Sequence, residues 1–485
     1  MAADDHVTPE QSPVDVDDAR AVWESLPEEE RTALRDREAA RLFAIGSDHQ
    51  RNGRLEEAIP EYTRALGLNP NLAEAYNNLG VVLRATGRPE AAVSCYRRAI
   101  ALKPRNASSH SNLGNVLRDL GRFEAAVASH QQAVHLDPKN ADTLHNLGVA
   151  LRDLGRRDQS LDCFERALDN NPAHVPSQLD RGRSLLLAGE YAAGFKDLEA
   201  RFQMRRFRLR GMDTPRWDGS KAKGKTVLVS CEGTLGDIIQ FVRYIPLIKQ
   251  QGANVVLEAP AVLADLLATV SGADKVIVQG ADLPKFDMHA PLLSLASIFK
   301  TTAGKVPADT PYLTPPDPGA FRLPPGGNIL KVGIAWADER PATHTTPTPG
   351  LRPFLELAGL AGVTLFGLQT GPAAGGLNSE GTEALIIDLT RRAGGLAGLA
   401  AYIDQMDIVI AVDGAVAHLA GALGKETWVI APVSPDWRWG TSGDTTPWYP
   451  SVRVLRAERR ADWQGLLDQT RRDLRARVRR GNNGT

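Results

Sequence analysis

The pattern of apolar and polar positions divides the chain into three regions. In residues 17–38 the pattern is helical, with Trp23, Leu26 and Leu34 as its apolar residues. Residues 39–207 carry small and apolar residues that return at a fixed interval, and downstream of them short apolar runs alternate with helical stretches. The sequence therefore predicts a capping helix, an array of repeated helices, and a body of alternating strands and helices.

The repeated region has a period of 34 residues. Two columns of glycine, one of alanine and one of proline keep this interval: Gly46, Gly80, Gly114, Gly148 and Gly182; Gly53, Gly87, Gly121, Gly155 and Gly189; Ala65, Ala99, Ala133 and Ala167; Pro70, Pro104, Pro138 and Pro172. Small residues let two helices cross closely, and a proline ends the second helix of a pair. The columns predict about five helix pairs, and the fifth lacks the closing proline, as expected of a terminal repeat that meets another body.

Both the interval and the columns resemble the tetratricopeptide repeat, a pair of antiparallel helices that stacks into an α superhelix. Such arrays usually bind peptides or proteins and rarely perform chemistry. The resemblance therefore implies that residues 39–207 hold a protein partner, and that any reaction belongs to the body that follows.

Three asparagines also keep the interval, at Asn78, Asn112 and Asn146, each in an Asn-Leu-Gly sequence. Asparagine is a mediocre helix former, so helix propensity does not explain them. The ladder resembles that of the O-linked N-acetylglucosamine transferases, which implies a groove whose amides bind the backbone of an extended protein acceptor. The alternative is hydrogen bonding between neighbouring repeats. The outer repeats lack the ladder and have Ala44 and Asp180 at the matching positions.

The downstream region predicts two sets of parallel α/β units. Helices are predicted over 237–251 and from Ala261, and a loop-rich stretch with six prolines at 310–328 separates the sets. The predicted strands are 226–230, 254–258 and 275–278 in the first set, and 330–336, 364–369, 385–388 and 408–412 in the second. Two nucleotide-binding halves joined by a proline-rich hinge predict a cleft between them.

The first candidate site follows strand 226–230, at Glu232, Gly233, Gly236 and Asp237. The glycines permit a tight turn at the carboxyl end of a parallel strand, where open α/β sheets bind ligands. The first three residues are predicted to form the loop of the cleft, and Asp237 is predicted to act as a general base. The alternative is that Asp237 only stabilises the helix start as a first-turn acid.

The second candidate site follows strand 408–412, where Asp413 and Gly414 precede a helix that carries Ala415 and His418. Gly414 lets the backbone approach a ligand, and the unpaired amides of the helix start suit a pyrophosphate. These residues are predicted to bind a donor diphosphate. The alternative is an aspartate that caps the helix, together with a buried histidine.

Five segments carry a second resemblance. EGTLGDIIQFVRYIPLIK, FDMHAPLLSLASIF, DGAVAHLAGALGKETWVIAP, PDWRW and PWYP occur in this order. They look like bacterial proteins that join tetratricopeptide repeats to a glycosyltransferase domain related to the lipopolysaccharide heptosyltransferases. The resemblance covers most of residues 225–456 and implies a GT-B fold and an inverting transfer from a nucleotide sugar, with no metal and no further cofactor. It also implies that Asp237 is the base, and that Asp413, Gly414 and His418 belong to the nucleotide loop.

The sequence departs from these relatives at groups that would meet donor phosphate. Gly414 stands in place of a threonine or serine, Thr370 in place of a lysine, and the loop that contains Arg340 is less basic. Arg340, Arg352 or His418 is therefore predicted to stabilise the leaving diphosphate. If none of them does so, the transferase domain binds its donor weakly or is degenerate.

Composition narrows the class of protein. The 485 residues carry a net charge of −1, so no global field recruits nucleic acid or a membrane surface. The cysteines Cys95, Cys163 and Cys231 follow no metal-ligand spacing and are predicted to be reduced core residues. The N-terminus lacks the pattern of a signal peptide, and no run of 18 apolar residues occurs, so we expect a cytoplasmic protein without a transmembrane segment.

The sequence thus predicts seven segments and one reaction. The segments are an acidic arm with a cap helix (1–38), the repeat array (39–207), a basic linker (208–224), an acceptor half (225–310), a hinge (311–328), a donor half (329–460), and a C-terminal helix with a basic tail (461–485). The predicted reaction is protein O-glycosylation from a nucleotide sugar, and the family resemblance suggests flagellin or another surface-bound protein as acceptor. The rival prediction is a scaffold or adaptor with a vestigial transfer cleft.

Overall fold

The computed structural model describes residues 21, 23–204, 207–210, 212–316, 319, 321–323, 329–338, 348–379, 381–459 and 462–482. Arg340, one of the predicted donor-binding residues, lies outside the described residues. The chain forms two compact units, Met1–Ala150 and Leu151–Thr485, and each is described by itself.

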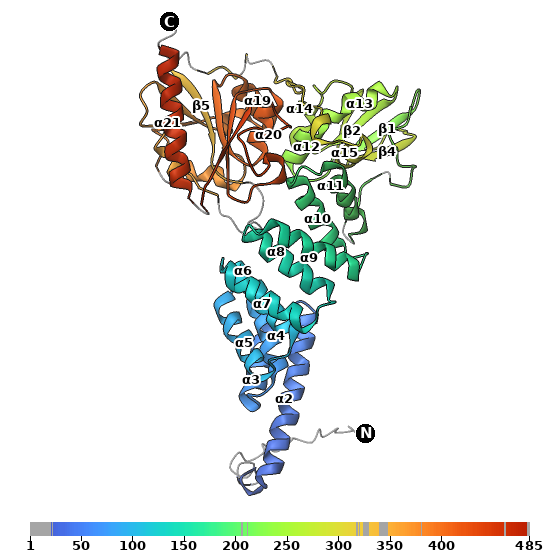
Figure 1. The fold of residues 1–485 in the computed structure, drawn as a ribbon, viewed down its shortest axis with the longest axis vertical. Coiled ribbons are helices and arrows are strands. Elements are labelled where there is room, and N and C mark those ends of the chain that lie inside the picture. The colour runs from blue at the N-terminus through green and yellow to red at the C-terminus, as the bar shows by residue number, and fades with distance from the viewer. Residues whose placement is uncertain are drawn as a thin grey trace, which may run out of the picture. The chain divides into compact units, whose positions relative to one another are not determined.

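The first unit is an array of antiparallel helices (Figure 1). Its helices are α2 (Glu28–Arg51), α3 (Leu55–Leu68), α4 (Ala73–Ala85), α5 (Pro89–Leu102), α6 (Ala107–Asp119), α7 (Phe123–Leu136) and α8 (Ala141–Asp153), whose last residues pass into the second unit. Helix α2 follows Pro27 and runs without a break into the first repeat, so the predicted boundary at residue 38 lies inside one helix.

The glycine columns have two separate causes. Gly87 and Gly121, between the helices of a pair, have φ values of 77° and 72°, a left-handed conformation that disfavours side chains. Gly80, inside α4, packs against the ring of Tyr96, and an added Cβ atom would lie 2.7 Å from that ring. The first column therefore permits a close helix crossing, and the second permits the turn.

The ring that faces the crossing glycine changes along the array. Tyr62 faces Gly46 and Tyr96 faces Gly80, but His130 occupies the same place opposite Gly114. His130 is fully buried, and neither of its ring nitrogens has a hydrogen-bond partner in the part of the chain that the structure describes. The array thus contains a buried histidine ring where the two preceding repeats have tyrosines.

The second unit begins with the last repeat helices and continues into two parallel sheets. The repeat helices are α9 (Arg157–Asn170), α10 (Val175–Leu187) and α11 (Tyr191–Leu198), followed by the 3-10 helix η1 (Glu199–Gln203). Side chains of Leu186, Tyr191 and Phe195 belong to the same buried cluster as the strands of the first sheet. The last repeat is therefore part of the sheet-bearing body, not a separate module.

The first sheet has the strand order β3-β2-β1-β4, with all neighbours parallel. Its strands are β1 (Thr226–Ser230), β2 (Asn254–Ala259), β3 (Lys275–Val278) and β4 (Met288–Pro291). Its helices are α12 (Leu235–Phe241), η2 (Val242–Tyr244), α13 (Ile245–Gln250), α14 (Ala261–Leu267), η3 (Leu292–Ser294), α15 (Leu295–Ile298) and η4 (Ala303–Lys305).

The second sheet has the order β10-β9-β8-β5-β6-β7 and is also parallel throughout. Its strands are β5 (Leu330–Ala335), β6 (Val363–Gly367), β7 (Ile386–Asp388), β8 (Ile408–Val412), β9 (Thr427–Ala431) and β10 (Val452–Arg456). Its helices are α16 (Arg352–Leu355), η6 (Pro372–Gly375), α17 (Gly376–Ser379), α18 (Thr390–Ala393), α19 (Leu396–Asp404), α20 (Ala415–Ala422), η7 (Trp437–Trp439) and α21 (Trp463–Asn482).

The predicted strands all occur, three of them with the predicted bounds, namely β1, β3 and β8. Strands β4, β9 and β10 were not predicted. The predicted helix over 237–251 starts at Leu235 and is interrupted by η2 just before Pro246, because proline cannot donate the hydrogen bond that a continuous helix needs there.

Each sheet reverses its strand order beside its first strand. In the first sheet β1 lies between β2 and β4, and in the second β5 lies between β6 and β8. Open α/β sheets bind ligands at such a reversal, outside the carboxyl ends of the strands. The chain that leaves β1 enters α12, and the chain that leaves β8 enters α20, so both predicted site segments lie at a reversal.

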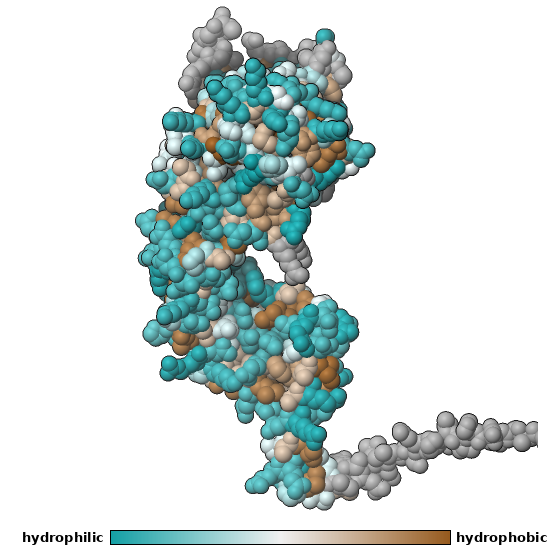
Figure 2. Space-filling model, turned by 90° about the vertical axis from the view of Figure 1, so that its right-hand side faces the viewer, coloured by the Kyte–Doolittle hydropathy of each residue, from teal (hydrophilic) through white to brown (hydrophobic). Residues whose placement is uncertain are grey.

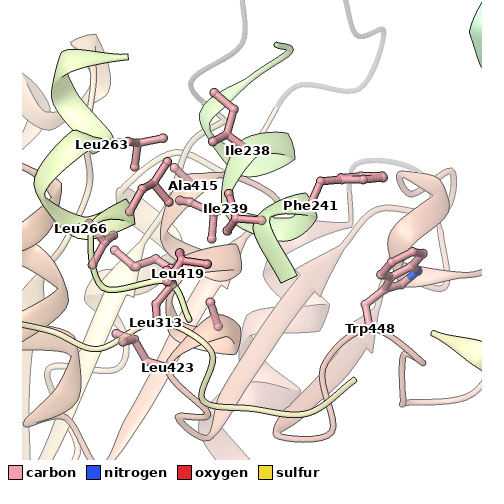
Figure 3. Close-up of a cluster of buried hydrophobic side chains, with 14 of the residues drawn as sticks. Ile238, Ile239, Phe241, Leu263, Leu266, Leu313, Ala415, Leu419, Leu423 and Trp448 are labelled. Atoms are coloured by element: carbon pink, nitrogen blue, oxygen red, sulfur yellow. The ribbon is translucent and has the colours of Figure 1, made fainter. Parts of the chain in front are cut away.

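Helices α12 and α20 pack against each other and carry apolar side chains from both halves into one core. Figure 3 shows Ile239 of α12 and Leu419 of α20 in this cluster, with Leu266 of α14 beside them. Leu313 of the predicted hinge joins the cluster and is buried, and Tyr312 donates its backbone N–H to Ala422 at the end of α20. The described start of the hinge is thus packed into the core.

Hydrophilic residues predominate on the face of the molecule in Figure 2, and apolar residues occur there in small patches. Cys95, Cys163 and Cys231 are free thiols; Cys163 and Cys231 are buried, as predicted, whereas Cys95 is half-buried. Within the described ranges, no helix is both long and apolar enough to cross a membrane.

Candidate functional site

The candidate site lies where the start of α12 meets α20. Gly236 of α12 packs directly against the ring of His418 in α20, so that an added Cβ atom would lie 2.6 Å from the imidazole. This contact brings Asp237, which follows a strand of the first sheet, near His418, which follows a strand of the second sheet. The two segments predicted to carry the chemistry are therefore neighbours.

Asp237 closes a capping box at the start of α12. Its Oδ2 accepts hydrogen bonds from the backbone N–H of Thr234 at 2.7 Å and from the hydroxyl at 2.8 Å, while the hydroxyl of Thr234 accepts from the backbone N–H of Asp237. Gly233, in a left-handed conformation with φ of 85°, leaves room for this carboxylate, because a Cβ atom there would lie 2.6 Å from Oδ2. Asp237 therefore stabilises the start of α12, as the predicted alternative expected.

The other carboxylate oxygen of Asp237, Oδ1, accepts a hydrogen bond from the guanidinium of Arg438. Burial by itself acts to raise the pKa of Asp237. The charge of Arg438 and the hydrogen bonds from Thr234 outweigh that effect, and the pKa lies below its usual value. Asp237 is therefore an ionised carboxylate that is engaged through both oxygens.

His418 is buried, with 3% of its surface exposed. Its Nδ1 lies 2.8 Å from the hydroxyl of Tyr449, its Nε2 lies 3.6 Å from Oδ1 of Asp413, and its ring stacks on Trp439 at a centroid distance of 5.3 Å. Burial lowers the pKa of His418, although Asp413 acts in the opposite direction. His418 is a packed imidazole with polar neighbours on both ring nitrogens, and its burial favours the neutral form.

The start of α20 has a backbone arrangement that suits an anion. Gly414 is the N-cap residue and has extended backbone with φ of 169°, and no side chain caps the helix there. A Cβ atom on Gly414 would meet no atom within 4 Å, so the surface beside it is open, whereas Ala415 is buried. The N–H groups at a helix start favour phosphate and carboxylate groups.

Glu232 does not stand free in the loop. Its carboxylate is buried and pairs with Arg201 of η1 through two hydrogen bonds of 2.9 and 2.7 Å, and it also accepts from the backbone N–H of Leu293 after β4. Arg201 donates in addition to the hydroxyl of Ser294 at 2.7 Å. The strand-order reversal of the first sheet is therefore occupied by a side chain from the end of the repeat array.

Of the remaining predicted donor residues the structure describes Arg352, and it also describes Thr370, which stands where the resembling proteins have a lysine. Arg352 is exposed at the start of α16, a helix that packs against α21. Thr370 follows β6, and its neighbour Gln369 is buried and bonds the backbone of the chain after β5, through 2.8 Å contacts to the N–H groups of Trp336 and Ala337. Neither residue is joined by these contacts to the start of α20.

The prediction missed Arg438, the cation at the centre of the site. It is buried, it donates to Asp237 and to Gln240 of α12, and it lies 2.8 Å from the carboxylate of Asp436. The Trp-Arg-Trp sequence was a usable signal, because an arginine between two tryptophans in a segment after a strand is expected to be held by aromatic rings. No group of three or more His, Cys, Asp or Glu side chains suited to a metal ion occurs among the described residues.

The asparagine ladder forms contacts between repeats. Nδ2 of Asn112 donates to Oδ1 of Asn77 in the preceding repeat at 3.1 Å, and Nδ2 of Asn146 donates to the hydroxyl of Ser111 at 3.3 Å. Oδ1 of Asn78 accepts from Asn77 at 3.4 Å. The three amides are half-buried, so each keeps some polar surface beyond these contacts.

Comparisons with known proteins identify the first part of the chain. Models described as tetratricopeptide repeat or TPR repeat match residues 43–107, 95–128, 114–155 and 141–174. The N-terminal region consists of tetratricopeptide repeats. Domains of this kind commonly bind peptides or proteins, so the repeats are suited to a protein-interaction scaffold.

One curated relative is similar over more than half of the chain. Protein FlbA of Caulobacter vibrioides is 26% identical over 341 residues, which cover 61% of this chain and 54% of the relative. The chain thus spans about half the length of the curated relative that it matches.

Several solved structures are similar to part of the chain. A crystal structure of MamA is 22% identical, covering 33% of this chain and 93% of that one, with a TM-score of 0.30. Pseudomonas aeruginosa PilF is 21% identical, covering 45% and 88%, with a TM-score of 0.35. YrrB, titled a TPR protein with an unusual peptide-binding site, is 21% identical, covering 39% and 91%, with a TM-score of 0.31.

Proposed function

We propose that this chain is a protein O-glycosyltransferase of the GT-B type, in which the repeats capture a protein acceptor and the two-sheet body transfers a sugar from a nucleotide-sugar donor. One observation carries the proposal. Asp237 after β1 and the Asp413–His418 segment after β8 lie together at the strand-order reversals of two parallel sheets.

In the proposed reaction the acceptor hydroxyl oxygen attacks the anomeric carbon of the sugar from the face opposite the leaving group. The bond between that carbon and the phosphate oxygen breaks, the nucleoside diphosphate leaves, and the proton of the hydroxyl passes to Asp237. The open backbone around Gly414 and the amides at the start of α20 would stabilise the diphosphate charge. The anomeric centre is thereby inverted, and no metal takes part.

A second candidate function is supported by the engagement of Asp237. Both of its oxygens already accept hydrogen bonds, from Thr234 and Arg438, and its lowered pKa makes it a weak base. Such a carboxylate can stabilise the start of α12 and pair with Arg438 without taking part in a reaction. The alternative function is a tetratricopeptide-repeat scaffold whose α/β body performs no transfer.

A panel of nucleotide sugars and nucleoside diphosphates separates the two candidates. Under the transferase proposal, one donor family raises the melting temperature, by an amount that grows with its concentration as expected for binding to the folded state. The matched control is Gly414→Leu, since its side chain would enter the open space beside the proposed diphosphate site. Absence of any shift across the panel, or an equal shift in the Gly414→Leu variant, would favour the scaffold.

A further inference from the structure

Three consecutive side chains, Trp437, Arg438 and Trp439, reach three different parts of the second unit. Trp437 packs on the last repeat helix, Arg438 bonds the start of α12, and Trp439 stacks on His418 of α20. All three side chains are buried. One turn of 3-10 helix thus joins the terminal repeat to both candidate site segments.

The contact with the repeat is an aromatic cluster. The ring of Trp437 lies edge-on to Phe195 at a centroid distance of 5.6 Å, to Tyr191 at 6.1 Å and to Trp448 at 5.4 Å. The indole N–H of Trp448 donates to the hydroxyl of Tyr191 at 3.1 Å. Such edge-to-face pairs prefer particular ring orientations, so the position of α11 restricts the orientation of Trp437.

The contact with the site passes through Arg438. Its guanidinium lies over the ring of Trp437, 4.3 Å from the centroid, a favourable cation–π arrangement. From that place it donates to Asp237 and to Gln240, whose side chains lie on α12. A displaced Trp437 ring would therefore remove one of the surfaces that hold Arg438 on Asp237.

We propose that Trp437 transmits the position of the terminal repeat to Arg438, and that the terminal repeat is thereby a positioning element for Asp237. The inference rests on the proposed function only in treating Asp237 as a catalytic group. The link itself runs entirely through residues of the second unit, from α11 through η7 to α12. A protein that binds the last repeat and shifts α11 would then change the position of Arg438 beside Asp237.

The pKa of Asp237 is a measure of how closely Arg438 is held against this carboxylate. The groups that act on this carboxylate are Arg438 from η7, Thr234 from its own helix start and His418 from α20, and Arg438 itself is also near Asp413 and Asp436. Of the two groups that can carry a positive charge, Arg438 lowers the pKa of Asp237 more than His418 does. A shift of Arg438 away from Asp237 must raise the pKa of Asp237.

The test is a titration of Asp237 in the full chain, with no donor or acceptor present. Protein labelled with ¹³C at the aspartate carboxyl carbons is compared with the Asp237→Asn variant, whose missing signal identifies Asp237. The variants are Phe195→Leu, Trp437→Leu and Arg438→Met. The control is Phe354→Leu, the same substitution at an equally buried ring in the second hydrophobic cluster.

We expect the midpoint of the wild-type signal to lie below the usual value for an aspartate. Arg438→Met should raise the midpoint by about one pH unit or more, and Phe195→Leu and Trp437→Leu should raise it by a fraction of that amount, since an opposite charge at this range lowers a carboxyl pKa by about 1–3 units. Phe354→Leu should lower the melting temperature without moving the midpoint. In Trp437→Phe, which keeps an aromatic ring, the midpoint should lie closer to the wild-type value than in Trp437→Leu.

An unchanged midpoint in Phe195→Leu, with Arg438→Met shifted, would overturn the inference, because Arg438 would then hold Asp237 without help from the repeat. Equal shifts in Phe195→Leu and Phe354→Leu would overturn it as well. If Trp437→Leu fails to fold, Phe195→Leu decides the result. The titration requires no nucleotide sugar, so its failure is distinguishable from failure of the transferase proposal.

Discussion

Arg438 donates a hydrogen bond from Nη2 to Oδ1 of Asp237, although 201 residues separate them in the sequence. The pair joins the segment after β9 to the start of α12, and both side chains are largely removed from water. Charges in such surroundings are costly unless they are paired and hydrogen-bonded. We therefore expect the pair to affect the stability of the candidate site and its proposed chemistry.

Replacing Asp237 by asparagine should lower the free energy of unfolding at pH 7. Removing one partner of a buried ion pair costs about 3–5 kcal/mol, and Asp436, which still faces Arg438, reduces the expected loss to about 2 kcal/mol. Because folding lowers the pKa of Asp237, its stabilisation is present above the unfolded value of about 3.9 and is lost as the pH falls through the folded value. Urea unfolding at pH 7 and pH 3 should show a smaller difference at pH 3, and equal differences would contradict the pairing.

The same variant tests the general base. If Asp237 accepts the acceptor proton, Asp237→Asn should lower turnover by about 100-fold or more, with nucleotide-sugar binding retained. Asp436→Asn is the matched control, because it removes another carboxylate from Arg438 without touching the start of α12. Similar turnover in both variants would leave Asp237 with a structural role at the helix start.

His130 should make the repeat array sensitive to acid. Burial lowers the pKa of His130 from its usual 6.5 to about 3, so the folded state disfavours the proton that the unfolded state binds. Stability should therefore fall as the pH decreases from about 6.5 towards 3, with a loss of about 2 kcal/mol by pH 5. His130→Phe, which copies the ring of Phe164 in the next repeat, should remove this dependence, as measured by melting temperatures from pH 7 to pH 5.

The control for this experiment is His135→Phe, at an exposed position of the same helix. That variant should retain the acid sensitivity of the wild type. A wild-type array whose melting temperature does not change between pH 7 and pH 5 would show that water or a local opening reaches His130.

The parts of the fold that were predictable are those with a regular sequence signal. The interval of 34 residues specified the helix pairs, and apolar runs such as Ile408–Val412 specified buried parallel strands. Strand β4, with the sequence Met-His-Ala-Pro, was missed because it contains no Val, Ile, Thr, Tyr, Phe or Trp and ends in proline. Its place in the sheet comes from pairing with β1, which no local pattern encodes.

The candidate site was only partly predictable for a similar reason. Asp237 and His418 each follow a strand, and that local signal is present in the sequence. The arginines that bind the site carboxylates are distant in the sequence: Arg438 donates to Asp237, and Arg201 donates to Glu232. Both contacts depend on how the last repeat and the second sheet pack. Local sequence patterns do not specify such contacts.

Replacing Asn78, Asn112 and Asn146 together by alanine should leave the stability of the array almost unchanged. Two hydrogen bonds between repeats are lost, at about 0.5–1.5 kcal/mol each, but alanine is the better helix former by a few tenths of a kcal/mol or more at each position. The two effects are similar in size and opposite in sign. A loss of unfolding free energy well above about 2 kcal/mol would assign the asparagines to repeat cohesion alone.

The same triple variant tests partner capture. The remaining polar surface of the three amides is expected to bind an extended peptide backbone, so the amount of co-purified protein should fall about tenfold or more. Intact-mass measurement identifies the proteins that co-purify with the wild-type chain, and the variant is compared for those proteins. Capture equal to that of the wild type, in a variant that folds normally, would exclude the asparagine ladder as the binding surface.

The ion pair between Arg201 and Glu232 should fasten the terminal repeat to the first sheet. Arg201→Met leaves the buried carboxylate of Glu232 without its cation and should lower the free energy of unfolding by about 3 kcal/mol or more. Glu232→Gln should cost less, because Glu199 still pairs with Arg201 at 2.8 Å. The double variant removes both charges, so its loss should be clearly smaller than the sum of the single losses. Chemical denaturation of the four proteins gives the coupling energy.

The coupling should also appear in the behaviour of the terminal repeat. Hydrogen exchange of the α11 amides should speed up in the single variants together with that of α12, because both helices belong to one buried cluster. Phe354→Leu, which weakens the other cluster, is the control and should leave the exchange of α11 unchanged. Additive losses in the denaturation cycle, or faster exchange confined to α11, would show that the repeat and the sheet unfold independently, and the link from the repeat to Asp237 would then lack a rigid support.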